Sequence, residues 1–286
     1  METEGHDKEA AYEAKMVKKT VLARQRRKMR RKELLGSMTA EERKEFVANE
    51  AREEEERVRR LAEAPEKGQR IAIDCGYDGI MSNKEVSSLS KQIKFCYGTI
   101  KRMDNPFALT VTDCSEGSRI ASALKRFSAD KWSIKLEPSN VSSLYPQSDL
   151  VFLTPDSSTT LTSLDFSKVY VIGGIVDRSR VKGRSLEAAT ALGVATARLP
   201  IQEYVPDRHT DHVLNVNTVV EILASIQAGN DWPTTLAQCL PKRKQASMSR
   251  RVLKRQAKEL TTSDEIQERD NNDVDAKADD IGEDNA

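Results

Sequence analysis

An acidic residue surrounded by cations follows a glycine pair in the stretch VYVIGGIVDRSRVKG, residues 169–183. The apolar run breaks at the pair Gly173-Gly174, and Asp177 comes three residues later. Its neighbours are three cations, Arg178, Arg180 and Lys182. A carboxylate here suits proton or hydrogen-bond acceptance, the cations suit anionic groups, and glycine lets a backbone approach a ligand closely. The stretch therefore predicts a ligand site at the end of this strand; the alternative for Asp177 is that it only caps or salt-bridges its loop.

Two further expected strand ends carry small or polar residues, FLTPDS at 152–157 and ARLPI at 197–201. In open parallel sheets, ligands bind beyond the carboxyl ends of the strands. We therefore expect these two ends to converge with the glycine pair on one site. Such a site would hold its ligand largely through backbone groups.

Several common chemistries lack their sequence signatures. The spacings G-x-G-x-x-G, G-x-x-x-x-G-K-[ST] and G-x-S-x-G are all absent, which disfavours dinucleotide, P-loop and serine-hydrolase sites. The four cysteines form no C-x-x-C pair, and of the three histidines only His209 and His212 lie close together. A zinc site is therefore not expected, and free thiols in a reducing compartment are.

Alternating strand-like and helix-like segments must position the site. The expected strands are RIAID (70–74), FALTVT (107–112), WSIKL (132–136), DLVFLT (149–154), KVYVIGG (168–174) and TARLP (196–200). The expected helices lie within 83–97, 116–127, 185–192, 213–230 and 232–244. Several strands are apolar without alternation, as strands buried on both faces are. The pattern predicts an α/β fold with a parallel sheet covered on both faces.

The net charge of the 286-residue chain is only +1, but its positive and negative charges are concentrated in different segments. Lys18–Lys32 carries nine Lys/Arg and no acid, Lys242–Lys258 carries eight, and Asp264–Asp284 carries ten acids. The basic runs indicate a polyanionic partner; the first run also fits a nuclear localisation signal. Residues 38–64 predict a charged helix with Thr39 as its N-cap and Glu42 completing a capping box, unless that helix is only a solvated face.

Three regions are expected from these shifts in composition. They are a basic, charged helical extension at 1–65, an α/β domain at 66–245, and a basic flank with a disordered acidic tail at 246–286. No run of about 18 apolar residues and no secretory signal is present, so we expect no membrane span and a cytoplasmic or nuclear location.

Several motifs, in order, resemble one known family. They are IDCGYDGIMSNKEVSSLSKQI, FLTPDS, YVIGGIVDRSRVKG, ATARLPIQEYV, VLNVNTVVEIL and LPKRK. Over about residues 69–244 the chain resembles the knotted SPOUT-type methyltransferases that modify N1 of the purine at tRNA position 9. The resemblance implies a SPOUT domain with a C-terminal trefoil knot, S-adenosylmethionine (SAM) as methyl donor, no metal, tRNA as substrate, and a monomer.

The resemblance also assigns residues. The cofactor site it implies comprises Leu153, Thr154, Gly173, Gly174, Lys182, Leu186, Leu199, Val213, Leu214 and Asn217. Asp177 would be catalytic, and the substrate would be bound by Asp74, Gln92, Arg178 and Arg180. The residues alone fit a turn-forming role for Asp74 and Asp78 equally well, and they favour a helix-surface position for Gln92 over a place in the site.

Guanine is the expected target base, and its N1 carries a proton at neutral pH. Asp177 would position N1–H and stabilise the developing charge. The chain departs from the family pattern at Ser179, Thr218, Val220 and Gly76-Tyr77, which leaves the choice between guanine and adenine open. The alternatives are a methyltransferase acting on another RNA position, and a non-catalytic RNA-binding subunit.

Overall fold

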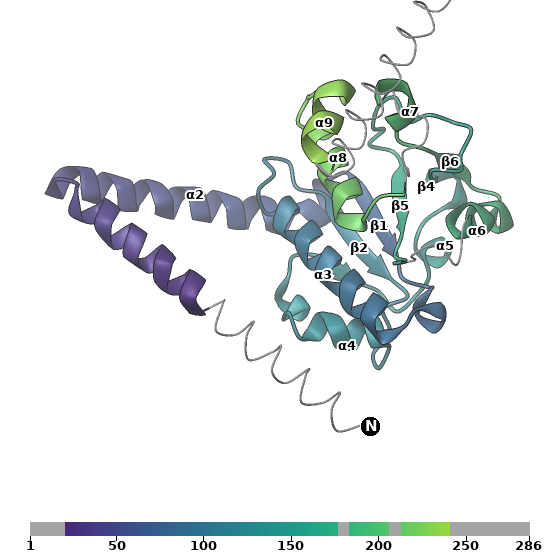
Figure 1. The fold of residues 1–286 in the computed structure, drawn as a ribbon, viewed down its shortest axis with the longest axis horizontal. Helices are drawn as coiled ribbons and strands as arrows, with labels where there is room; N and C mark the ends of the chain where they lie inside the picture. The colour runs from purple at the N-terminus through teal and green to yellow at the C-terminus, as the bar shows by residue number, and fades with distance from the viewer. Residues whose placement is uncertain (1–20, 177–182, 206–212, 241–286) are drawn as a thin grey trace, which may run out of the picture. The chain divides into compact units, whose positions relative to one another are not determined.

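The computed structural model describes residues 21–176, 183–205 and 213–240 (Figure 1). The chain divides into two compact units, Met1–Arg59 and Arg60–Ala286. The predicted trefoil knot and acidic tail involve segments outside the described residues, so both stay predictions.

The described residues of the first unit are largely helical. Residues 21–36 form a helix, and α2 (Ala40–Lys67) follows it after a short turn. Thr39 and Glu42 bond reciprocally at the start of α2, because the Glu42 carboxylate accepts from the Thr39 amide (2.8 Å) and Thr39 Oγ1 accepts from the Glu42 amide (3.3 Å). This confirms the predicted capping box. Arg31 pairs with Glu50, which ties the two helices together.

The second unit is built on a six-stranded sheet. Its strands are β1 (Arg70–Asp74), β2 (Ala108–Thr112), β3 (Lys135–Leu136), β4 (Leu150–Leu153), β5 (Val169–Gly173) and β6 (Ala195–Ala197). The order is β3-β2-β1-β5-β4-β6, and every pairing is parallel. The predicted parallel α/β sheet is confirmed, with strand ends within a few residues of those expected.

Helices cover both faces of this sheet (Figure 1). One face packs against α3 (Asn83–Ile100), α4 (Arg119–Lys125), α8 (Val216–Gln227) and α9 (Trp232–Cys239). The other face packs against α5 (Val141–Leu144) and α6 (Arg184–Leu192). Side chains alternate along a strand, so Ile71 and Ile73 enter the first core cluster and Ala72 enters the second. Strands buried on both faces explain the continuous apolar runs in the sequence.

Short elements complete the second unit. They are the 3₁₀ turns η1 (Asp78–Ile80), η2 (Ala129–Lys131) and η3 (Gln147–Asp149), and the helix α7 (Ile201–Tyr204). The four-residue helices α5 and α7 were not predicted, because one turn shows no helical periodicity. All four cysteines are free, as expected.

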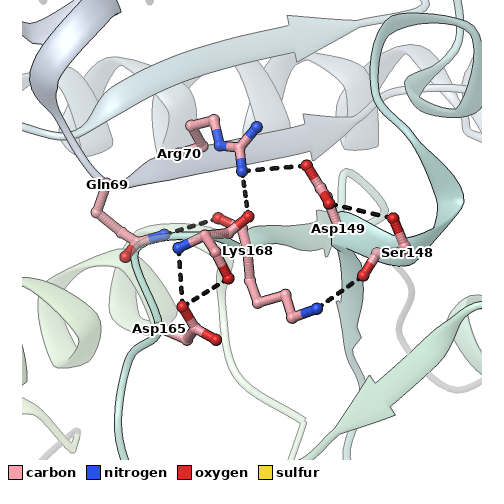
Figure 2. A network of polar contacts seen from close by, with 7 residues as sticks. Gln69, Arg70, Ser148, Asp149, Asp165 and Lys168 are labelled. Atoms are coloured by element: carbon pink, nitrogen blue, oxygen red, sulfur yellow. Dashed lines mark hydrogen bonds and ion pairs between the residues drawn. The ribbon is translucent and has the colours of Figure 1, made fainter.

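Polar contacts fasten the amino ends of β1, β4 and β5 (Figure 2). Gln69 Nε2 donates to the Lys168 carbonyl (2.9 Å), and the Arg70 guanidinium pairs with Asp149 (3.3 Å). Lys168 Nζ donates to the Ser148 carbonyl (2.8 Å). These contacts close the amino edge of the sheet, opposite the carboxyl ends where ligands bind in open parallel sheets.

Candidate functional site

A pocket lies beyond the carboxyl ends of β4, β5 and β6 and against the start of α8. Four segments line it, within 153–155, 172–175, 198–202 and 213–219, and Ser185 of α6 completes it. We call this cavity the strand-end pocket. Its position is the one at which open parallel sheets bind ligands.

Six of the predicted cofactor residues meet in the strand-end pocket, namely Leu153, Thr154, Gly173, Leu199, Val213 and Leu214. They come from three strand ends and the approach to α8, so the expected convergence of strand ends is observed. Gly174, Leu186 and Asn217 do not line it; the Asn217 amide contacts Glu221 (3.4 Å) on its own helix.

Four predicted residues, Asp177, Arg178, Arg180 and Lys182, lie outside the described residues. The chain on either side of them is described. Ile175 lines the strand-end pocket, and Gly183 is the N-cap of α6 with φ at 79°.

Gly174 is required by close approach of the chain to itself. A Cβ on Gly174 would lie 2.6 Å from the Asp74 carbonyl oxygen, to which the Gly174 amide donates. Because that oxygen belongs to the backbone, only glycine fits at this position. A Cβ on Gly173 would lie 2.5 Å from Ser185 Oγ, so a larger residue there would require the Ser185 side chain to move.

Asp74 lies half-buried at the end of β1, beside the end of β5. Its Oδ1 accepts from the Gly76 amide (3.0 Å). Burial raises the pKa of Asp74 to about 6; the Gly76 hydrogen bond opposes the rise, and the nearby charge of Asp113 adds to it. Burial, with the nearby Asp74 charge, also raises the pKa of Tyr77 to about 12. Asp74 is therefore a carboxylate that exchanges its proton near neutral pH.

Gln92 is buried rather than exposed on the surface of α3. Its Oε1 accepts from the Val216 amide (2.9 Å), the first residue of α8. This bond satisfies one of the amides that a helix start leaves unpaired. Val216 and Val219 both line the strand-end pocket, so Gln92 supports the pocket from behind.

Sequence reasoning missed several lining residues, among them Ile172, Ser185, Gln202, Val216 and Val219. The valines, three residues apart at the start of a helix, were a usable signal because such residues share a face. Ser185 carried no signal, since its place depends on how α6 approaches β5.

The described part of the chain meets neither the requirements of a metal site nor those of a membrane-spanning helix. There, no group of three or more His, Cys, Asp or Glu is arranged to hold a metal ion. Within the same residues, no helix has the length and apolarity needed to cross a membrane.

Comparison with known proteins gives a consistent result. Residues 4–245 match the family described as tRNA (guanine(9)-N(1))-methyltransferase TRM10/TRM10A. The chain belongs to this family. The match runs from the helical extension through α9, and so covers both compact units.

Individual TRM10 relatives agree. The chain is 36% identical to tRNA methyltransferase 10 homolog B of Bos taurus, over 65% of this chain and 61% of that protein. It is 30% identical to the tRNA (guanine(9)-N1)-methyltransferase of Schizosaccharomyces pombe, over 82% of this chain and 75% of that protein. The match thus spans about three fifths of the first relative's length and three quarters of the second's.

Among solved TRM10 structures, the fold is similar to the crystal structure of full-length spTrm10 in complex with SAH. The TM-score is 0.55 and the identity is 31%, over 60% of this chain and 94% of that chain.

Proposed function

We propose that this protein transfers a methyl group from SAM to N1 of the guanine at position 9 of tRNA. The observation that carries the proposal is the meeting of six predicted cofactor residues in the strand-end pocket. Two further findings support it. The chain belongs to a family described by this reaction, and a related crystal structure with 31% identity contains SAH.

The strand-end pocket fits SAM in its chemistry. Its walls are mainly apolar, with Leu153, Ile172, Leu199 and Leu214 suited to the adenine ring. Its polar side chains are few, namely Thr154, Ser185, Arg198 and Gln202. The Arg198 guanidinium is already paired with Glu203 (2.6 Å), which leaves backbone groups and the other three side chains for hydrogen bonds to the ligand.

Bound SAM would supply an electrophilic methyl group on a sulfonium. The role of the protein would be to hold guanine N1 in line with that methyl group and to accept the N1 proton. We assign proton acceptance to Asp177, and contacts with the nucleotide to Asp74, Arg178 and Arg180. The methyl–sulfur bond breaks as the N1–methyl bond forms, the N1 proton passes to the carboxylate, and the second product is S-adenosylhomocysteine (SAH).

We assign tRNA binding to the basic extension, within the region 1–65. Seven cations on the helix of residues 21–36 are exposed, namely Arg24, Arg26, Arg27, Lys28, Arg30, Arg31 and Lys32. Such a helix neutralises phosphates irrespective of base sequence. The flank after residue 241 adds a second basic segment in the sequence. We also propose that the protein acts as a monomer in the cytoplasm or nucleus.

Methyl transfer from labelled SAM tests this proposal. The purified chain would be assayed with tRNA transcripts that differ only in having guanine or adenine at position 9. We expect incorporation into the guanine transcript, mapped to that nucleotide. Incorporation at another position would indicate a different RNA methyltransferase. SAM binding without incorporation would favour a non-catalytic subunit.

A further inference from the structure

Two carboxylates meet at the carboxyl ends of β1 and β2. Gly76 lies between them: a Cβ built on it would be 3.2 Å from Asp74 Oδ1 and 3.5 Å from Asp113 Oδ2. Within the described ranges, no ion pair joins either carboxylate to a cation. Asp78, the third acid nearby, is already paired with Arg119 (3.2 Å). Besides the Gly76 amide, Asp74 contacts the side chains of Asp113 and Tyr77, so a ligand at these carboxylates would compete only with uncharged or like-charged groups.

One buried hydroxyl group near these carboxylates has no hydrogen-bond partner. Thr112 is fully buried, and its Oγ1 bonds to nothing. It is the register partner of Asp74, so its side chain lies on the same face of the sheet. Buried polar groups are nearly always hydrogen-bonded in native structures, so this atom points to a missing polar ligand. We call Asp74, Gly76, Thr112 and Asp113 the carboxylate corner.

The backbone holds Asp113 in place. Its φ of 53° lies in the left-handed region, which costs a non-glycine residue free energy and persists where the surrounding structure enforces it. The Asp113 amide donates to the Ser139 carbonyl (3.1 Å), and the next amide, of Cys114, donates to Glu137 (2.9 Å). The carboxylate is therefore presented from a fixed strand end rather than from a long loop.

The carboxylate corner adjoins the strand-end pocket. Gly173 lines the pocket and is the register partner of Asp74. Strand β1 lies between β5 and β2 in the sheet. The ends of β5 and β2 are therefore two strand spacings apart, a distance of roughly 10 Å. Because N1 and the 2-amino group of guanine share C2, a guanine lying between the pocket and the carboxylate corner can present N1 to a methyl group on one side and its 2-amino group to the corner on the other.

The chemistry of the corner suits guanine. On its pairing edge, guanine carries two adjacent donors, N1–H and the 2-amino group. Adenine has an acceptor at N1 and no amino group at C2. Ionised carboxylates are acceptors only, so they bind guanine's edge and repel that of adenine. Two neighbouring carboxylates also repel each other, and donors from a ligand relieve that repulsion.

We propose that Asp113 accepts a hydrogen bond from the 2-amino group of the target guanine, with Asp74 beside it in the carboxylate corner. Asp113 is then a residue that determines base specificity, separate from the proton acceptor Asp177. The inference rests on the function proposed above and identifies how that site selects its base.

Inosine provides the test, because it is guanine without the 2-amino group. The wild-type chain would be assayed with transcripts carrying guanine, inosine or adenine at position 9. We expect kcat/KM to be about 10- to 100-fold higher for guanine than for inosine, as for a hydrogen bond to a charged group. Asp113→Gly removes the carboxylate while accepting the positive φ. In this variant kcat/KM for the guanine transcript should fall to the value for the inosine transcript, and kcat/KM for the inosine transcript should change less than about threefold.

A second variant and a control separate specificity from folding. Asp113→Asn keeps both the side-chain size and the left-handed backbone, and should show an intermediate preference. Ser128, with φ at 55°, is the other non-glycine residue of positive φ in the described residues, and Ser128→Gly should leave all rates unchanged. A structural defect would lower the guanine and inosine rates equally.

Two outcomes would overturn the inference alone. One is equal methylation of guanine and inosine by the wild-type chain, and the other is an unchanged guanine-to-inosine ratio in Asp113→Gly. Absence of methylation on every transcript would overturn the proposed function, and this inference with it.

Discussion

At the scale of single residues, Gly174 and Asp74 determine how the ends of β1 and β5 meet. The Gly174 amide donates to the Asp74 carbonyl, and the Asp74 side chain turns back to the Gly76 amide. The backbone contact leaves no room for a side chain at residue 174. The Asp74 carboxylate lies where burial makes its ionisation unfavourable.

Gly174→Ala should destabilise the fold. The new Cβ would lie 2.6 Å from a backbone oxygen, which cannot move away as a flexible side chain can. We expect a loss of about 1–3 kcal/mol in unfolding free energy, measured by urea denaturation. Gly79→Ala is the matched control, because a Cβ there meets nothing within 4 Å. Equal stability of the two variants would contradict the close approach.

Asp74→Asn should change how stability depends on pH. The folded-state pKa of Asp74, about 6, is above the ordinary value of 3.8, so the group stabilises the fold when protonated and this contribution is lost as pH rises through 6. Asparagine does not titrate. Relative to wild type, the variant should therefore gain on the order of 1 kcal/mol between pH 5 and pH 7 in urea denaturation.

A stability difference between Asp74→Asn and wild type that stayed constant from pH 5 to pH 7 would show that the Asp74 carboxyl titrates in the folded protein as it does in the unfolded chain.

At the scale of elements, α3 and α8 act together to shape the strand-end pocket. They lie side by side over the sheet, and the single bond from the Val216 amide to Gln92 links the middle of α3 to the start of α8 (Figure 1). The start of α8 then supplies Val216 and Val219 to the pocket. A residue 124 positions earlier in the chain thus fixes a wall of the ligand site.

Gln92→Ala should weaken SAH binding as well as stability. The Val216 amide would be left buried without an acceptor, at a cost of about 1–3 kcal/mol. We expect a lower melting temperature and an increase in the SAH dissociation constant by calorimetry. Ser88→Ala removes only the weaker contact of the same glutamine, at 3.4 Å, and should leave SAH affinity unchanged. If the two variants bound SAH equally well, Gln92 would have no role in positioning α8.

Most elements were predictable because their signals are local. Apolar runs without polar alternation identified β1, β2, β4 and β5, since both faces of each are buried. The carboxylate corner was not predictable. Asp74 and Asp113 are far apart in sequence, and only the strand order places β2 beside β1 and brings them together. Ser185 was not predicted for the same reason, because long-range packing leaves no local pattern in the sequence.

At the scale of the whole molecule, charge is divided between regions of different chemistry. The helix of residues 21–36 has seven exposed cations, whereas the strand-end pocket is mainly apolar and the carboxylate corner is acidic. Under the proposed function, this division would give affinity for tRNA to the extension and the choice of base to the α/β unit.

Replacing Arg26, Arg27 and Arg30 together with glutamine should weaken tRNA binding. Each lost phosphate contact lowers the dependence of log Kd on log salt concentration by about 0.7–0.9, so a decrease of about two is expected. SAH affinity should not change. The measurement is fluorescence anisotropy with tRNA over a range of KCl concentrations. Lys125, Arg126 and Lys131, all exposed in the second unit, allow a control with the same change in net charge. Equal effects of the two sets would contradict a specific role for the extension.

The strand order has a consequence for the protein during its synthesis. Gln69 and Lys168, at the starts of the two central strands, are 99 residues apart, and the pocket is completed only by residues 213–219. While the chain emerges from the ribosome, β1 lacks its neighbour β5 until residue 173 has been synthesised. A nascent chain shorter than about residue 219 lacks a wall of the ligand site, so ligand binding can stabilise only a chain that extends past that residue.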